Sequence, residues 1–324
     1  EGFIGSHLTE MLIKQKYDVR AFVLYNSFNS WGWLDHCSSD VSGMFDVFSG
    51  DIRDPHGVRT AMRDRDVVVH LAALIAIPYS YHSPDTYVET NIKGTLNVVQ
   101  AVRELSVEKL VHTSTSEVYG MSPDKTFNEY STNLVVGPVT KPRWIYSISK
   151  QLLDRIIIAF GEQKKLEYTI FRPFNWIGPK IDSLKQAKLK NGRVLTIFIY
   201  NILNNKDIVL VGNGNQKRSF TYIDDGISAL IKIIENKKNN LNKKIFNIGN
   251  PNNNISVKKL AKILIARYQI LYPNKYKGKI VYKSEKEFYG KGFEDIPLRV
   301  PDISEAKKYL NWTPKNNVDS SIFK

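Results

Sequence analysis

Short apolar strands that alternate with helices constrain the fold of this sequence more than any other feature. Strands are expected over residues 18–24, 45–48, 67–71 and 110–111, and helices over residues 6–16, 56–63 and 85–105 lie between them. Such an alternation, with short turns, is typical of an α/β protein with a doubly wound parallel sheet. Ligands of such sheets bind at the carboxyl ends of the strands, so functional residues are expected at that edge.

The regular alternation ends after a further strand at residues 168–171. We expect a dinucleotide-binding domain over residues 1–174, whose first strand would precede Glu1. A smaller substrate-binding lobe is expected over residues 175–324. Segments near residues 219–250, which contain one more helix and one more strand, are expected to return to the first domain.

Two glycines at the start of the chain predict a cofactor loop. Gly2 and Gly5 match the last two glycines of a G-x-x-G-x-x-G loop, with a helix directly behind them. The first of them would let the backbone approach a pyrophosphate, and the second would let the helix pack closely. A simple helix start is the alternative, which the following strands and helices disfavour. The predicted cofactor residues here are Gly2, Phe3, Ile4 and Gly5.

A second group of predicted cofactor residues lies at the end of the strand at 45–48. Asp51, followed by Ile52, could accept a hydrogen bond from an adenine amino group, although a cap of a turn is the alternative. The usual acidic residue about 20 positions after the glycines is not obvious, and Asn26 or Ser27 occupies its place. Because no arginine stands there to bind a 2′-phosphate, NAD is favoured over NADP.

The expected catalytic residues follow the strand that ends near Val111. Thr115, Ser116 and Glu117 come where that strand ends and the chain turns. Tyr146 and Lys150 are four apart in a predicted helix, so they share one face. An ammonium near a phenol favours the phenolate and makes the tyrosine a better base. Although a Tyr/Lys pair can occur by chance, this combination suits removal of a proton from a sugar hydroxyl while hydride leaves the same carbon.

Composition narrows the function classes. Hydrophobic residues make up 42% and charged residues 24% of the chain, as in soluble globular proteins. Cys37 is the only cysteine, so we expect no internal disulfide, and we predict no metal site. No apolar run approaches the length of a membrane span, and no basic segment followed by an apolar one begins the sequence. A cytoplasmic protein without membrane insertion is therefore expected.

Charge is uneven along the sequence. Residues 1–120 carry a net charge of −5 and residues 121–324 one of +19. The lysines of the second part are scattered among asparagines, so nucleic-acid binding is not expected, whereas a diphosphate-bearing substrate would suit the charge. Arg193, Arg218 and Arg299 are conspicuous in a half with 29 lysines and 7 arginines. Because guanidinium groups match carboxylate and phosphate oxygens, these three arginines are candidates for binding an anionic ligand. The alternative is that each forms an ion pair at the surface.

The motifs together resemble a known family. Gly2, Gly5, Glu117, Tyr146 and Lys150 resemble the extended short-chain dehydrogenases/reductases that act on nucleotide sugars, whose fold is Rossmann-like. Over residues 113–314 the sequence is similar to the UDP-glucuronate decarboxylase domains of bifunctional polymyxin-resistance proteins, which serve lipid A modification. The motifs that carry this likeness are TSTSEVYG, NLVVGPVTKPRWIYSISKQLLDR, FRPFNWIGPK, NQKRSFTYIDDGI, NIGNP and YGKGFED.

Residues 1–112 resemble a different group. GDIRDPHGVRTAM and HLAALIAIPYSYHSPDTYVETNIKGTLNVVQA are similar to nucleotide-sugar 4,6-dehydratases of the legionaminic-acid type. The change falls near the TSTSEVYG motif, where the composition also changes. We therefore hypothesise that the chain joins two compatible halves of one fold.

The resemblance implies roles for individual residues. Tyr146 would be the base at the sugar 4-hydroxyl, and Lys150 would hold the nicotinamide ribose. Thr115 would bond the sugar, while Ser116 and Glu117 would face the uronate. Arg299 would act beside the carboxylate of the sugar.

Further residues are implied in binding UDP. Asn175, Arg193 and Arg218 would hold it, and Phe293 stands where the family has a tyrosine, so a hydroxyl contact is lost there. The resemblance also implies a homodimer or higher homo-oligomer, paired through helices that include residues 146–160.

The implied activity is NAD-dependent oxidation of UDP-glucuronate at C4, followed by decarboxylation to a UDP-4-keto-pentose. A 4,6-dehydratase acting on UDP-N-acetylglucosamine is the nearest alternative, and such enzymes typically carry an aspartic acid where Ser116 stands. In a 4-epimerase, a further alternative, Glu117 would have no clear function. A non-catalytic nucleotide-sugar or dinucleotide sensor is the alternative from another class.

Overall fold

A four-stranded parallel sheet forms the centre of the molecule. The computed structural model describes residues 1–163, 166–189, 192–289 and 294–323. The strands lie in the order β10-β5-β4-β3, and every neighbouring pair is parallel. Their bounds are β3 Val67–His70, β4 Lys109–Thr113, β5 Tyr168–Pro173 and β10 Lys244–Ile248. All five residues of β4 are buried, as expected of a strand covered on both faces.

A separate pair of parallel strands precedes this sheet in sequence. β1 (Arg20–Leu24) pairs with β2 (Asp46–Gly50), in a register that sets Arg20 opposite Asp46. Within the residues described, no strand joins this pair to β3. The strands predicted from the sequence are thus present, and their parallel pairing is confirmed.

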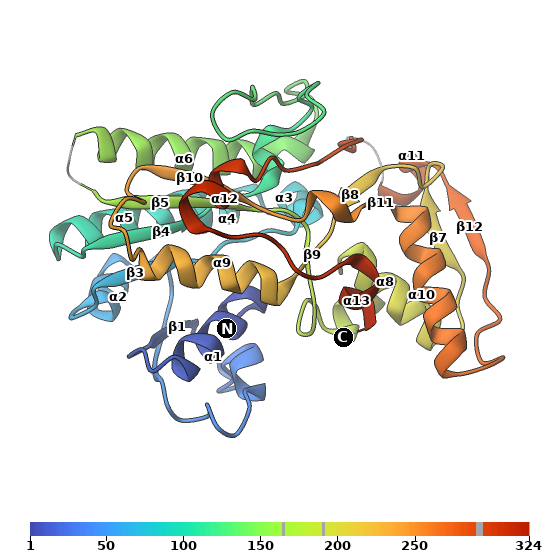
Figure 1. Ribbon diagram of the computed structural model, residues 1–324, viewed down its shortest axis with the longest axis horizontal. Coiled ribbons are helices and arrows are strands. Elements are labelled where there is room, and N and C mark those ends of the chain that lie inside the picture. The colour runs from blue at the N-terminus through green and yellow to red at the C-terminus, as the bar shows by residue number, and fades with distance from the viewer. Residues whose placement is uncertain (164–165, 190–191, 290–293, 324) are drawn as a thin grey trace.

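Helices cover both faces of the sheet, as Figure 1 shows. One face packs on α1 (Phe3–Lys14), α9 (Ile223–Glu235) and α12 (Ser304–Leu310). The other packs on α2 (Pro55–Met62), α5 (Gly94–Glu104) and α6 (Ile145–Glu162). Val111 and Phe171 are fully buried in the first core and Leu110 and Ile170 in the second. Each such side chain contributes about 1.5–3 kcal/mol of transfer free energy.

The single helix predicted over residues 85–105 is interrupted in the structure. α4 (Pro84–Tyr87) is followed by a π-helical segment, Val88–Lys93, and only then by α5. The wider π turn holds the buried side chain of Asn91. Its amide donates to the carbonyl of Leu74 at 2.9 Å and accepts from the Leu74 N–H at 2.8 Å. The π turn thus lets Asn91 bind the backbone of the segment after β3, which explains the interruption of the helix. The spacing of apolar residues in the sequence could not reveal it.

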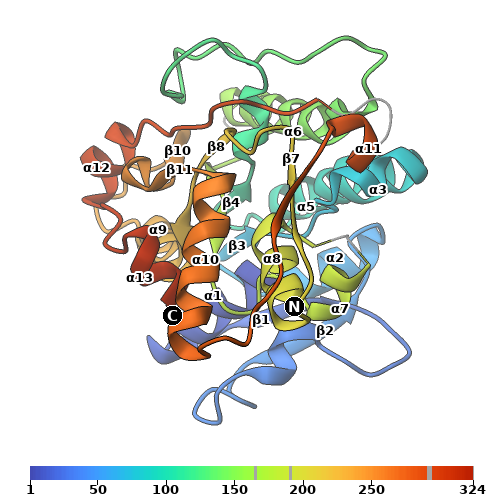
Figure 2. The ribbon, with the colours of Figure 1, turned by 90° about the vertical axis from the view of Figure 1, so that its right-hand side faces the viewer.

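The second half of the chain adds a smaller lobe with its own apolar core, seen at the front of Figure 2. Its main elements are α7 Leu184–Lys188, α8 Val194–Leu203, β7 Ile208–Val211, β8 Lys217–Ser219, β11 Asn254–Ser256, α10 Val257–Leu271 and β12 Ile280–Lys283. The polar and basic residues at positions 182–192 favour a loop, but residues 184–188 form α7. Ser183 and Gln186 form a capping box that starts this helix, and S-x-x-Q is the sequence signal for it.

Shorter elements connect these parts. They are the helices α3 Ile77–His82, α11 Glu285–Tyr289 and α13 Val318–Phe323, the strands β6 Trp176–Ile177 and β9 Thr221–Tyr222, and the 3₁₀ turns η1 Gly32–His36, η3 Ser116–Tyr119, η4 Pro142–Trp144 and η5 Pro251–Asn253.

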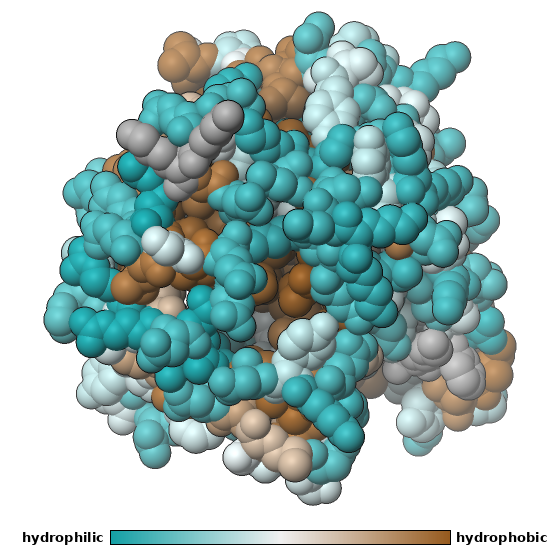
Figure 3. All heavy atoms as spheres, turned by 60° about the vertical axis from the view of Figure 1, so that its left-hand side comes forward, coloured by the Kyte–Doolittle hydropathy of each residue, from teal (hydrophilic) through white to brown (hydrophobic). Residues whose placement is uncertain are grey.

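One face of the molecule is mostly polar (Figure 3). On the face drawn in Figure 3, hydrophobic atoms show mainly in recesses between hydrophilic side chains. No helix of the described residues has the length and apolar character that a membrane crossing requires.

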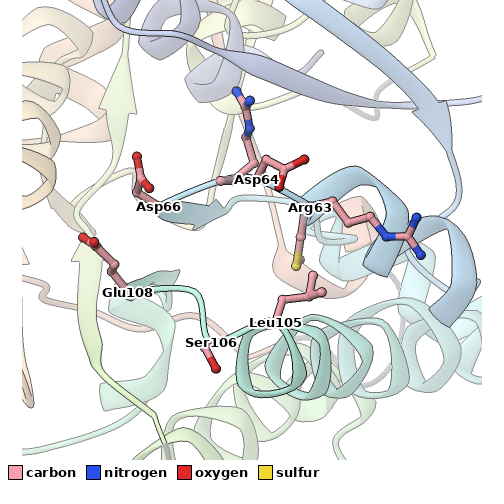
Figure 4. Close-up of a pocket in the computed structure, with 8 residues that line it drawn as sticks. Arg63, Asp64, Asp66, Leu105, Ser106 and Glu108 are labelled. Atoms are coloured by element: carbon pink, nitrogen blue, oxygen red, sulfur yellow. The ribbon is translucent and has the colours of Figure 1, made fainter.

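A pocket of about 340 Å³ lies at the amino ends of β3 and β4. Asp66 and Glu108 stand on one side of it and Arg63 on the other (Figure 4). This is the edge of the sheet opposite the carboxyl ends, so the pocket is separate from the residues expected to be functional.

Side chains of the segment after η3 cover the outer edge of the sheet. Glu129 Oε1 accepts from the N–H of Asn247 at 2.6 Å, and the Tyr130 hydroxyl accepts from the N–H of Ile245 at 3.2 Å. Both donors belong to the edge strand β10, whose outward N–H groups would otherwise lack partners. Burial raises the pKa of Glu129 to about 7, and the nearby charge of Asp302 acts in the same direction.

This raised pKa predicts a pH-dependent stability. Between its unfolded value near 4.5 and about 7, Glu129 holds a proton in the folded state that it has lost in the unfolded state, so stability falls as pH rises through this window. Glu129→Gln should remove this loss, which we expect to be about 3 kcal/mol. Urea unfolding at several pH values measures it, with the exposed Glu108→Gln as control. If the unfolding free energies of the wild type and Glu129→Gln changed with pH in the same way, the raised pKa of Glu129 would be contradicted.

Candidate active site

The carboxyl end of β4 places the hydroxyl and carboxylate residues predicted from the sequence. After Thr113 the backbone is extended at Thr115, whose Oγ1 accepts from the N–H of Glu117 at 3.2 Å. This bond caps the 3₁₀ turn η3 and sets Ser116 and Glu117 in its first turn. All three side chains are buried, so the strand end presents them to the protein interior.

Glu117 is held between two arginines. Arg143 Nη2 donates to its Oε2 at 2.8 Å, and Arg299 Nη1 donates to its Oε1. Burial acts to raise the pKa of Glu117, but the charges of Arg299 and Arg143 outweigh it and hold the pKa at about 2. Glu117 is therefore ionised at neutral pH.

The two arginines come from segments far apart in the sequence. Arg143 lies in η4, where its Nε donates to the Glu294 carbonyl at 2.5 Å and its guanidinium stacks 4.3 Å over the Trp144 ring. Arg299 is fixed through its own carbonyl, which accepts from Ser219 Oγ at 2.9 Å. The sequence predicted Arg299 but missed Arg143, although it is one of the few arginines in a lysine-rich half.

Tyr146 lies beside this group, near the start of α6. Burial raises its pKa, while a hydrogen bond with Thr115 and the charge of Arg193 lower it. Its ring makes an edge contact with Tyr87, with ring centres 6.5 Å apart. The phenol is therefore neutral in this structure, and Thr115 and Arg193 are the groups placed to favour its ionisation.

Lys150 follows one helical turn later and is also buried. Its Nζ donates to the carbonyl of Thr113 at 2.8 Å. Burial lowers the pKa of Lys150 to about 8, and Asp154 opposes this shift. Lys150 is thus anchored on the end of β4.

Tyr81 is a further residue at this place that the sequence did not single out. It lies in α3, and its buried hydroxyl has no hydrogen-bond partner among the described residues. Burial raises its pKa, and the charges of Arg143 and Glu117 also act on it. A buried hydroxyl near the Arg143 guanidinium and the Glu117 carboxylate could bond a ligand, but only the folded chain brings α3 and η4 together.

The start of α1 is compatible with a dinucleotide pyrophosphate. Gly2 is the N-cap of this 12-residue helix, no side chain of the described residues caps it, and a Cβ at Gly2 would meet nothing within 4 Å. The first N–H groups of α1, on Phe3 and Ile4, are thus free for an anion. At Gly5 a Cβ would meet Leu71 at 3.6 Å, an ordinary contact, so its expected role in close packing gains no support.

The other predicted cofactor residues have partners within the protein. Asp51 Oδ1 accepts from the backbone N–H and from Nε of Arg53, both at 2.9 Å, which is the turn-capping arrangement. Ile52 packs against Gly94. A Cβ atom added to Gly94 would lie 2.8 Å from Cγ2 of Ile52. The Asn26 amide bonds the backbone of its own loop, where it donates to the Ser30 carbonyl at 2.8 Å.

The predicted UDP-binding residues differ in their surroundings. Arg218 joins the Glu117 group from β8: it donates to Asp295 at 2.5 Å, and burial, with the charge of Arg299, lowers its pKa to about 10. Asn175 has a buried Nδ2 that finds no hydrogen-bond partner in the described part of the chain. Arg193 is held at the start of α8. Phe293 lies outside the described residues.

No group of three or more histidine, cysteine or acidic side chains in the described part of the chain could hold a metal ion.

Comparison with known proteins places this arrangement in a family. A family model described as "NAD dependent epimerase/dehydratase family" matches residues 1–249. This chain belongs to the NAD-dependent epimerase/dehydratase family. NAD is therefore its cofactor, as the sequence predicted, and the extended short-chain dehydrogenase/reductase fold is confirmed.

Relatives in this family agree with the resemblance. The bifunctional polymyxin resistance protein ArnA of Wigglesworthia glossinidia brevipalpis is 41% identical over 337 residues, which include all of this chain and 49% of that protein. The chain thus spans about half the length of this relative. The match includes residues 1–112 as well, and the idea of two joined halves stays a hypothesis.

Solved structures share the fold. The PbgP3 protein of Burkholderia pseudomallei superposes with a TM-score of 0.82 and 36% identity, covering 99% of this chain and 91% of that one. UDP-glucose 4-epimerase of Thermus thermophilus, solved with NAD, superposes with a TM-score of 0.78 and 24% identity, covering 99% and 94%. The second likeness shows the fold alone.

The ion pairs of Glu117 predict a large effect on stability. Glu117→Gln would leave two buried guanidiniums without their counter-charge, which costs about 3–5 kcal/mol. Glu89→Gln breaks the exposed pair with Lys93 and should cost less than about 1 kcal/mol. Urea unfolding at neutral pH compares the two variants. Equal, small losses would show that the Glu117 group is not held as described.

Proposed function

We propose that the protein oxidises UDP-glucuronate at C4 and then decarboxylates it to a UDP-4-keto-pentose. The observation that carries this proposal is the group of Arg143, Glu117 and Arg299 beside Tyr146. Buried guanidiniums match a sugar carboxylate, and a phenol within the same site suits proton removal from a neighbouring hydroxyl. The similarity to a polymyxin resistance protein supports the same substrate.

In the first step, Tyr146 takes the proton of the sugar 4-hydroxyl. Bound NAD⁺ would supply the acceptor for the hydride that leaves C4. The hydrogen bond with Thr115 and the charge of Arg193 favour the phenolate that this step requires. Lys150, fixed on the Thr113 carbonyl, holds the nicotinamide ribose. Free N–H groups at the start of α1 receive the pyrophosphate.

In the second step, the new C4 ketone lies β to the C5 carboxylate. The bond between C5 and the carboxylate breaks, its electron pair moves toward the carbonyl, and carbon dioxide leaves an enolate that gains a proton at C5. Arg299 orients the carboxylate before it leaves. Glu117, with its pKa of about 2, keeps its charge and anchors Arg143 and Arg299 rather than acting as an acid.

Ser116 supports decarboxylation over dehydration. Loss of a 6-hydroxyl requires a proton donor at the position that an aspartic acid fills in the dehydratases. The Ser116 hydroxyl is a poor acid, and the neighbouring Glu117 is ionised.

Three further expectations remain part of this proposal. Asn175, Arg193 and Arg218 hold the UDP moiety. Residues 1–174 form the dinucleotide-binding domain and residues 175–324 the substrate lobe, with β10 returning to the first. Two copies pair through α6, whose side chains Ile148 and Leu152 are exposed.

The test is an assay of purified protein with NAD⁺ and UDP-glucuronate. Each substrate consumed should yield one carbon dioxide and one NADH, measured by gas release and absorbance. Tyr146→Phe should lower turnover by about 100-fold or more while changing the unfolding free energy by about 1 kcal/mol, the value of one hydrogen bond. Wild-type turnover in that variant would refute the role of Tyr146.

UDP-N-acetylglucosamine separates the alternatives in the same assay. The proposal predicts no dehydrated product from it. Its conversion to a 4-keto-6-deoxy sugar, without carbon dioxide release from UDP-glucuronate, would show a dehydratase. Binding of UDP-glucuronate and NAD⁺ without turnover would show a sensor.

A further inference from the structure

One face of α1 is covered by the segment that leads to Arg193. Phe3, His7 and Glu10 are spaced at i, i+4 and i+7, so they line a single face of this helix. All three contact described residues between positions 179 and 193. The same helix carries the glycine loop at its start, so this face lies directly behind the proposed pyrophosphate site.

The contacts along this face are specific. His7 Nε2 lies 3.0 Å from the Pro179 carbonyl oxygen. Lys180 Nζ lies 2.5 Å from Glu10 Oε1, with side chains only 15% and 19% exposed. The Arg193 guanidinium lies 5.6 Å from the centre of the Phe3 ring. A largely buried ion pair constrains position more than an exposed one does, because solvent screens it less.

The same segment fixes Arg193 from the other side. The Arg193 N–H donates to Asp182 Oδ2 at 2.8 Å, and its Nη1 donates to the Ile181 carbonyl at 2.9 Å. Lys180, next to Ile181, has a φ of +65°, a left-handed conformation that is unfavourable for lysine. The ion pair with Glu10 offsets this cost. Arg193 therefore takes its position from residues 180–182, and these take theirs from α1.

We propose that Glu10 and Lys180 are positioning residues that hold Arg193 and thereby couple dinucleotide binding to nucleotide-sugar binding. The inference rests on the proposed function in taking the start of α1 as the pyrophosphate site and Arg193 as a UDP ligand. A ligand that orders α1 also orders the face that Pro179, Lys180 and Arg193 contact, so the second ligand loses less conformational entropy on binding. By linkage, each ligand must strengthen the other by the same factor.

The experiment measures the affinity for UDP by calorimetry, with and without saturating NAD⁺. In the wild type we expect NAD⁺ to strengthen UDP binding by about 5-fold or more. Lys180→Met keeps the aliphatic stem but loses the charge, and should reduce this factor to about 1. In turnover with UDP-glucuronate, KM should rise by a larger factor than kcat falls, since Arg193 binds UDP directly but acts on the chemical step only through its charge near Tyr146.

Two further variants separate this effect from general destabilisation. The exchange Glu10→Lys with Lys180→Glu restores opposite charges and should recover most of the coupling. Lys93→Met breaks an exposed pair elsewhere and should leave the coupling as in the wild type. The inference would be overturned if NAD⁺ strengthened UDP binding to Lys180→Met as much as to the wild type. It would also be overturned if the charge exchange recovered none of the coupling. A wild type that binds no UDP would overturn the proposed function as well, whereas UDP and NAD⁺ binding without decarboxylation would leave the coupling standing.

Discussion

The ion pairs of Glu117 with Arg143 and Arg299 are the interaction on which the rest of the site depends. They join three parts of the chain that the fold brings together: the end of β4, the turn η4 before α6, and the segment before α12. Three charges buried at one point are costly unless each has its partner. The pairing of Glu117 with the two arginines keeps Glu117 ionised and the guanidiniums oriented beside Tyr146.

The surrounding fold supplies what this group requires. Parallel strands with helices on both faces bury β4 completely and bring its carboxyl end next to the first turn of α6. Tyr146 and Lys150 then project toward the end of β4, where Lys150 is fixed on the Thr113 carbonyl. The smaller lobe contributes Arg193 and Arg218 from α8 and β8. Sheet, helix and lobe thus converge on one edge, which the glycine loop of α1 also approaches.

Much of this was predictable because it depends on local sequence periodicity. The alternation of strands and helices and the i, i+4 spacing of Tyr146 and Lys150 are visible without a structure. One of the two arginines that bind Glu117 was not predictable, because Arg143 reaches the carboxylate only after η4 folds against η3. The π-helical segment around Asn91 depends on a hydrogen bond to a distant loop. The short helix α7 was missed although its cap Ser183 has a sequence signal, because its apolar residues are too few for a period to show.

A crystal structure of Tyr146→Phe with NAD⁺ and UDP-glucuronate would test the central claim most directly. The account predicts that the sugar carboxylate contacts Arg299, that Glu117 keeps its contact with Arg143, and that the sugar C4 lies within reach of the ring at position 146. A carboxylate that points away from Arg299, or a sugar whose C4 is remote from position 146, would contradict it.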